Sequence, residues 1–135
     1  MQSNDWAWLP TPRVEILPKA REALADKFVY SQEVADLISA AFYEPCNLLL
    51  WGPGGHGKSD MVLTALKALG LNDNEIFIQS FGEGMSEDRL WGGPDMASLD
   101  TCLRYDTDRS FLSSQYKAVV FEEIFDAPAQ SLLPL

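Results

Sequence analysis

The residues with the clearest chemical pattern form a glycine-rich segment at positions 52–59, GPGGHGKS. Its spacing, G-x-x-x-x-G-K-[ST], matches a phosphate-binding loop at every fixed position. In such a loop the backbone N–H groups turn inward around a phosphate, and glycines permit positive φ angles and leave no Cβ in the way of the anion. The pattern predicts a site for the phosphates of a nucleotide. The alternative is a glycine-rich turn with an incidental lysine.

The side chains at the end of this segment have predicted roles of their own. The Lys58 ammonium would reach the β- and γ-phosphates, and the Ser59 hydroxyl would ligate Mg²⁺. His56 occupies a variable slot and is either an exposed loop residue or a ligand. Asp60 suits the positive end of a helix dipole but would repel phosphates, so its carboxylate is expected to point outward. The predicted nucleotide-binding residues are Gly52, Pro53, Gly54, Gly55, His56, Gly57, Lys58, Ser59 and Asp60.

A second pattern is an apolar run at 118–121 that ends in two adjacent carboxylates, Glu122 and Glu123. Ligands of an open parallel sheet bind beyond the carboxyl ends of its strands, so this pair is expected beside the phosphate loop. One carboxylate would orient Mg²⁺ through a water, and the other would polarise the water that attacks the γ-phosphate. Because successive strand residues point to opposite faces, the two acids are expected to have different roles. The alternative is a solvated strand end with no chemistry.

The spacing of apolar residues predicts the elements that would position these groups. Short apolar runs predict buried strands at 47–51, 75–81 and 118–123. Helices are predicted from Pro18 to Phe28, from the N-cap Ser31 to before Pro45, and from Lys58 to before Gly70. The succession of strand, helix and strand implies a right-handed parallel crossover. Residues 82–100 are predicted as loop with at most one short helix at 86–91, and Trp51 and Trp91 as packing residues.

Length and composition narrow the class of protein. With 135 residues, of which 47% are hydrophobic and 22% charged, the chain suits one globular domain. Its net charge of −10 disfavours a broad nucleic-acid surface, and no run approaches the roughly 18 apolar residues that span a bilayer. Two cysteines without metal-ligand spacing predict reduced thiols and a cytoplasmic setting. Residues 1–17 are expected to form an extended arm, whose Trp6 and Trp8 pack on the domain or on another subunit.

The chain resembles the AAA+ ATPases, in particular the MoxR-like branch and its chelatase-type relatives. Three blocks carry the resemblance: the helix after Ser31 that runs into 47–59, the segment 85–92 (MSEDRLWG), and the segment 119–128 (VVFEEIFDAP). The resemblance implies an α/β fold of the P-loop NTPase type, a parallel sheet flanked by helices, with 18–135 as the N-terminal part of an ATP-binding domain. It also implies catalytic roles for Lys58 and Glu123, and a Mg²⁺ site at Ser59 and Glu122.

The same resemblance implies partners. They are ATP and ADP, a homo-oligomeric ring that is hexameric in the family, and a protein client such as a von Willebrand A-type partner; no nucleic acid or membrane is expected. Family members continue into a sensor strand, an arginine finger and a helical lid, which this sequence lacks. The sensor strand would lie between the phosphate-loop strand and the strand that carries the acids. The sequence is therefore expected to be part of a longer polypeptide.

The predicted function is Mg²⁺-dependent hydrolysis of ATP by an ATPase that remodels or activates a partner protein. The family usually has Asp where this chain has Glu122, so one alternative is a regulatory module that binds nucleotide without hydrolysing it. A small-molecule kinase is another alternative, but its acceptor site calls for basic or aromatic residues after the second strand, where this chain has GEG at 82–84. Residues 82–100 are either a partner-facing or pore-facing segment or a plain connecting loop.

Overall fold

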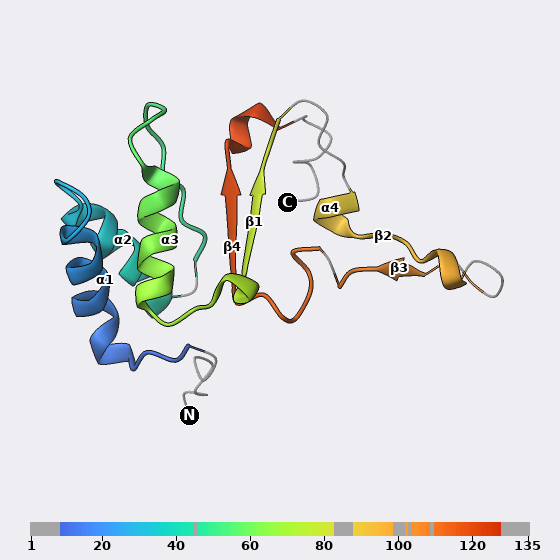
Figure 1. Ribbon diagram of the computed structural model, residues 1–135, viewed down its shortest axis with the longest axis horizontal. Coiled ribbons are helices and arrows are strands. Elements are labelled where there is room, and N and C mark those ends of the chain that lie inside the picture. The colour runs from blue at the N-terminus through green and yellow to red at the C-terminus, as the bar shows by residue number, and fades with distance from the viewer. Residues whose placement is uncertain are drawn as a thin grey trace. The chain divides into compact units, whose positions relative to one another are not determined.

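The computed structural model describes residues 9–44, 46–82, 88–98, 102, 104–108 and 110–127, without the side chains of Arg89 and Tyr105. The chain is an α/β protein, and it divides into two compact units, Met1–Asp73 and Asn74–Leu135 (Figure 1). Trp6, Trp8 and residues 85–87 of the 85–92 segment lie outside the described residues, as does the chain from 128 onward. No described helix is long and apolar enough to cross a bilayer.

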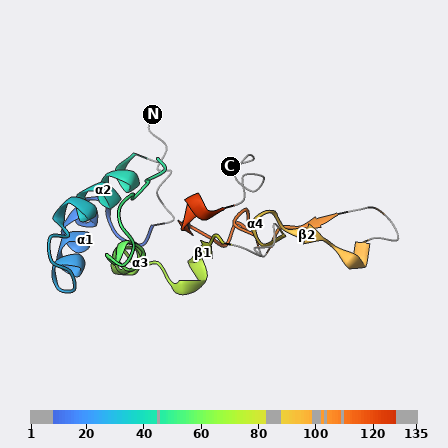
Figure 2. The ribbon, with the colours of Figure 1, turned by 90° about the horizontal axis from the view of Figure 1, so that it is seen from above.

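The described part of the first unit contains a three-helix cluster (Figures 1 and 2). Its helices are α1 (Ile16–Ala25), α2 (Gln32–Tyr43) and α3 (Lys58–Ala68), and a 3-10 turn, η1 (Arg13–Glu15), precedes them. α1 contacts both α2 and α3. Its buried residues recur every fourth position, at Ile16, Ala20 and Leu24, because residues four apart share one helical face. They pack in a core with Ala35, Ile38, Phe42, Ala65, Leu66 and Leu69.

The helix boundaries largely follow the sequence signals. α1 begins at Ile16, two residues before the predicted start, and Pro18 is tolerated because the amides of a first turn have no intrahelical acceptor. α3 stops where Gly70 was predicted to stop it: Gly70 has a φ of +92°, and the Leu71 N–H bonds back to the Leu66 carbonyl at 3.2 Å. Ser31 precedes α2 as predicted, but it is no side-chain cap, since its hydroxyl donates to the Phe28 carbonyl instead.

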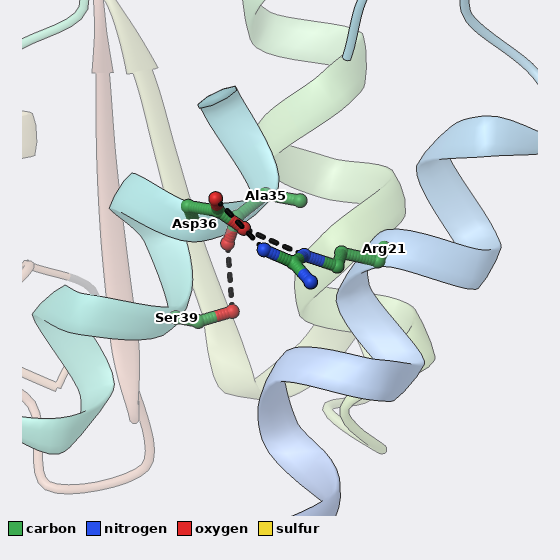
Figure 3. Close-up of polar contacts among 4 residues, drawn as sticks. All are labelled: Arg21, Ala35, Asp36 and Ser39. Carbon is green, nitrogen blue, oxygen red and sulfur yellow. Dashed lines mark hydrogen bonds and ion pairs between the residues drawn. The ribbon is translucent and has the colours of Figure 1, made fainter. Parts of the chain in front are cut away.

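An ion pair on the surface joins α1 to α2 (Figure 3). The Arg21 guanidinium donates from Nε to Asp36 Oδ1 at 2.8 Å and from Nη2 to Oδ2 at 3.0 Å. Next to it, the buried Ser39 hydroxyl donates to the Ala35 carbonyl at 2.7 Å, which satisfies a polar group inside the helix pair. The hydrogen bond from Arg21 is the main cause that lowers the pKa of Asp36 below its ordinary value of 3.8.

We expect this pair to make the stability of the first unit depend on pH in acid. Because the pKa of Asp36 is lower in the folded than in the unfolded chain, the stabilisation is fully present above about pH 4 and is lost as the pH falls through the folded value. Urea midpoints measured across acid pH should therefore differ between wild type and Asp36→Asn above about pH 4, and converge below it. Glu33→Gln, an exposed substitution on the same helix, is the control. A constant difference at all pH values would contradict the prediction.

The second unit is built on a parallel pair of strands, β1 (Ile76–Ser80) and β4 (Ala118–Glu122). These are the strands predicted at 75–81 and 118–123. Their register runs from Ile76 opposite Ala118 to Ser80 opposite Glu122, and the Phe81 N–H donates to the Glu122 carbonyl at 3.0 Å. Aromatic rings pack on them, with the centroids of contacting rings 5.2–6.4 Å apart. The rings belong to Phe77, Phe81, Trp91, Phe111, Tyr116 and Phe121, which confirms the packing role of Trp91.

Between these strands the chain forms a second, antiparallel pair instead of the predicted loop. The short helix α4 (Asp88–Trp91) falls within the predicted 86–91, and β2 (Gly93–Pro94) then pairs with β3 (Tyr105–Asp106). Strands of two residues are too short to show hydrophobic alternation, so no strand signal is present in the sequence at these positions. Gly92 immediately precedes β2, and its backbone adopts the left-handed conformation, with a φ of +84°.

Substitution of Gly92 by alanine should disrupt the β2–β3 pair. A Cβ at this position would lie 2.1 Å from the Asp106 carbonyl oxygen, far inside van der Waals contact, and the left-handed backbone alone costs an L-residue about 1–2 kcal/mol. Amide hydrogen exchange should therefore speed up at Gly93, at Asp95 and at 104–106 in Gly92→Ala. Gly93→Ala is the matched control, because the nearest atoms to its added Cβ would be those of Asp88, at an ordinary 3.6 Å. Equal protection in the two variants would refute the proposed contact.

The predicted strand at 47–51 is wrong. Residues 46–53 form no regular element and have no β-ladder partner among the described residues. Leu49 is 62% exposed and Trp51 is 84% exposed, so Trp51 does not pack either. A strand requires a neighbouring strand to accept its backbone hydrogen bonds, and apolar composition alone does not supply one.

Candidate functional site

The glycine-rich loop leads directly into α3, as the motif requires. Gly57 is the residue before the helix and has a φ of +70°, and Gly55 has a φ of +77°. These are the two places where the loop uses the freedom of glycine. A Cβ built on Gly52, Gly54 or Gly55 would meet nothing within 4 Å, whereas one on Gly57 would lie 3.3 Å from Phe28 Cε1. The loop is thus open along most of its length and backed by Phe28 at its end.

The N-terminus of α3 offers hydrogen-bond donors to an anion. The first intrahelical bond runs from the Met61 N–H to the Gly57 carbonyl at 2.9 Å, so the amides of Lys58, Ser59 and Asp60 have no acceptor within the helix. No side chain caps this end. Unpaired amides and the positive end of the helix dipole together favour phosphate binding.

Lys58 folds back over the loop that precedes it. Its ammonium donates to the Gly52 carbonyl at 2.9 Å and to the Pro53 carbonyl at 2.6 Å. The side chain therefore places a positive charge beside the loop backbone, held only by neutral acceptors. Charged phosphate oxygens are stronger acceptors than carbonyls, so they can displace these bonds. Ser59 is half-buried in the first turn of the same helix.

His56 and Asp60 make contacts of their own. His56 Nδ1 lies 2.9 Å from the Gly54 carbonyl, and since a carbonyl only accepts, this nitrogen carries the proton. The ring is exposed, in keeping with a loop residue. Asp60 is ion-paired with Lys27 at 2.8 Å, and the Lys27 ammonium also lies 5.3 Å from the Phe28 ring centroid. The negative charge of Asp60 is therefore offset by a partner on the segment after α1.

The adjacent acids Glu122 and Glu123 differ in their backbone conformation and in the contacts of their side chains. Glu122 is the last residue of β4, and its Oε2 accepts a hydrogen bond from the Ser80 hydroxyl at 2.7 Å. Glu123 is exposed and left-handed, with a φ of 54° and a ψ of 37°, and it opens the 3-10 turn η4 (Ile124–Asp126). The strand thus ends between the two residues. The alternation of faces along a strand does not extend to Glu123, and the turn sets the direction of its side chain.

Two features of this site were missed in the sequence. The left-handed conformation of Glu123 has no local signal, since a non-glycine residue there costs about 1–2 kcal/mol and Glu is not among the residues enriched in it. Backbone strain of this kind clusters at functional sites. The bond between Ser80 and Glu122 depends on strand register, which links positions 42 residues apart. Only a correct pairing of β1 with β4 could have revealed it.

The predicted residues thus form two clusters, each described within its own unit. The loop, Lys58 and Ser59 belong to the first unit, and Glu122 and Glu123 belong to the second. Within the described residues, no group of three or more His, Cys, Asp or Glu side chains could hold a metal by itself. Mg²⁺ prefers hard oxygen ligands, and each cluster has one: the first has the Ser59 hydroxyl and the second has the Glu122 carboxylate.

Three comparisons of the chain, with models of protein families, with curated proteins and with solved structures, find no match.

Proposed function

We propose that this chain binds ATP together with Mg²⁺ and is the ATP-binding part of an AAA+ ATPase of the MoxR-like type. The observation that carries the proposal is the geometry at the junction of the glycine-rich loop with α3. A left-handed Gly57 leads into an uncapped helix N-terminus whose first residue, Lys58, returns its ammonium to the loop. Open loop, free amides and an adjacent cation are the three requirements of a polyphosphate site.

Binding and hydrolysis would use the residues of both clusters. The loop amides and the first amides of α3 bind the β-phosphate, and Lys58 exchanges two carbonyl acceptors for phosphate oxygens. Ser59 and Glu122 would hold Mg²⁺, which supplies neutralisation of the charge on the phosphates. Glu123 would accept a hydrogen bond from the attacking water and take its proton as the water oxygen bonds to the γ-phosphorus and the bond from the γ-phosphorus to the bridging oxygen breaks, leaving that oxygen on ADP. The products are ADP and inorganic phosphate.

A second candidate is a regulatory module that binds nucleotide without hydrolysing it. The observation in its favour is Glu122, which stands where the family usually has Asp and whose carboxylate already accepts a bond from Ser80. A carboxylate carried on a longer side chain and held by a neighbouring strand reaches a different position from that of an Asp. Turnover distinguishes the candidates, because both bind MgATP and only the ATPase releases phosphate.

The wider setting is part of the same proposal. The ATPase would work as a homo-oligomeric ring in the cytoplasm and remodel or activate a protein client, in the way that the resemblance implies.

The direct test is equilibrium binding of a fluorescent ATP analogue to the full chain, with Mg²⁺ and with EDTA. We expect saturable binding that unlabelled ATP displaces and that Mg²⁺ strengthens. Binding that neither ATP displaces nor the loss of Lys58 weakens would overturn the proposal.

A further inference from the structure

We infer that Ser80 is a positioning residue for the metal-side carboxylate, Glu122. The inference rests on the proposed function, in which Glu122 helps to hold Mg²⁺. Its basis is the 2.7 Å hydrogen bond that the Ser80 hydroxyl donates to Glu122 Oε2 across the β1–β4 pair. This is the side-chain hydrogen bond that Glu122 makes within the described residues, and it sets the direction in which its flexible side chain points.

Strand register places the two groups together. Ser80 and Glu122 are opposite each other in the parallel ladder, and the Phe81 N–H bonds to the Glu122 carbonyl at 3.0 Å on the next rung. The Ser80 carbonyl also accepts from Gln79 Nε2 at 2.6 Å, and Gln79 is buried in the sheet. The backbone that carries the hydroxyl is thus held on both sides, and the bond to Glu122 forms without ordering any further segment.

The bond leaves the carboxylate able to bind a cation. A carboxylate has about four lone-pair positions, and one hydroxyl occupies one of them. The free Oε1 and the remaining positions on Oε2 can face a hydrated Mg²⁺ while Ser80 holds the group in place. Groups that orient a metal-binding carboxylate in this way typically change metal affinity 10- to 100-fold when they are removed.

Side-chain length makes the partnership specific to this chain. A Glu carboxylate extends one methylene further from the strand than an Asp carboxylate, and that length lets it meet the opposite hydroxyl. An Asp at 122 would retract from Ser80 and lose the bond. Glu122 and the Ser80 hydroxyl therefore act together, because the hydrogen bond from Ser80 restrains the additional freedom of the longer glutamate side chain.

The test is a set of full-chain variants titrated with Mn²⁺, detected by its electron paramagnetic resonance, in the presence of a non-hydrolysable ATP analogue. Ser80→Ala should weaken Mn²⁺ binding about 10-fold, whereas Ser80→Thr, which keeps the hydroxyl, should stay near wild type. In a Glu122→Asp background, Ser80→Ala should have no further effect. Affinity for the analogue in EDTA should not change in any of these variants. Ser114→Ala, which removes an exposed hydroxyl before β4, is the matched control.

The outcomes separate this inference from the function on which it rests. Wild-type Mn²⁺ affinity in Ser80→Ala would overturn the inference alone, as would equal losses in Ser80→Ala and Ser80→Thr. A weakened analogue affinity in EDTA would show a structural role for Ser80 and would also overturn it. If the wild-type chain binds no analogue at all, the proposed function fails and the inference fails with it.

Discussion

Lys58→Ala should lower the affinity of the full chain for MgATP about 100-fold or more. The ammonium now donates to two carbonyls, and in the complex it would donate to charged phosphate oxygens. Hydrogen bonds to charged groups contribute about 1.5–3 kcal/mol each, so the loss of two corresponds to at least about 3 kcal/mol, and every 1.4 kcal/mol is a factor of ten in affinity. The measurement is the binding titration with the fluorescent analogue.

Lys67→Ala is the matched control for this experiment. Lys67 lies in the last turn of the same helix, and its ammonium pairs with Asp73 at 2.7 Å at the end opposite the loop. Both substitutions remove one positive charge from α3, so a general electrostatic effect would weaken binding equally in the two variants. Circular dichroism should show the same helix content in both. If Lys58→Ala binds MgATP as tightly as wild type, the loop does not bind phosphate in the way proposed.

The loop could be predicted because its information is local. Six residues between strand-like and helical patterns determine where Gly57 and Lys58 lie, and the structure places a left-handed glycine at the start of a helix there. α3 itself follows from apolar residues at helical spacing, and β1 and β4 from short apolar runs. Such elements can be predicted because the residue pattern that indicates them lies within the elements themselves.

Other features depend on residues that are distant in the sequence. The run at 47–51 has the composition of a buried strand, but strands exist only in pairs, and its backbone has no ladder partner in the described chain. Trp51 shows the consequence, since a large aromatic was expected to pack and is 84% exposed. The contact of Ser80 with Glu122 is the converse case, because an unremarkable serine gains a role through register alone.

Glu123→Gln should leave MgATP affinity within about threefold of wild type and lower the rate of phosphate release about 100-fold or more, as expected for the loss of a general base. Glutamine has the same shape as glutamate, so the left-handed turn at φ 54° carries the same backbone cost before and after the change. The variant therefore removes one charge and one proton acceptor and leaves the fold intact. Single-turnover phosphate release, with binding measured in parallel, separates the two effects.

Asp126→Asn is the control, because it removes an exposed acid from the turn that follows Glu123. A loss of hydrolysis in Glu123→Gln alone would identify the left-handed carboxylate as the group that activates water. Equal, near-zero rates in wild type and Glu123→Gln, with MgATP still bound, would instead favour the regulatory module. In that case Glu122, which is held by Ser80, would be the first residue to test, because AAA+ ATPases usually have Asp at the corresponding position. A gain of turnover in Glu122→Asp would show that the additional methylene of Glu122 causes the loss of hydrolysis.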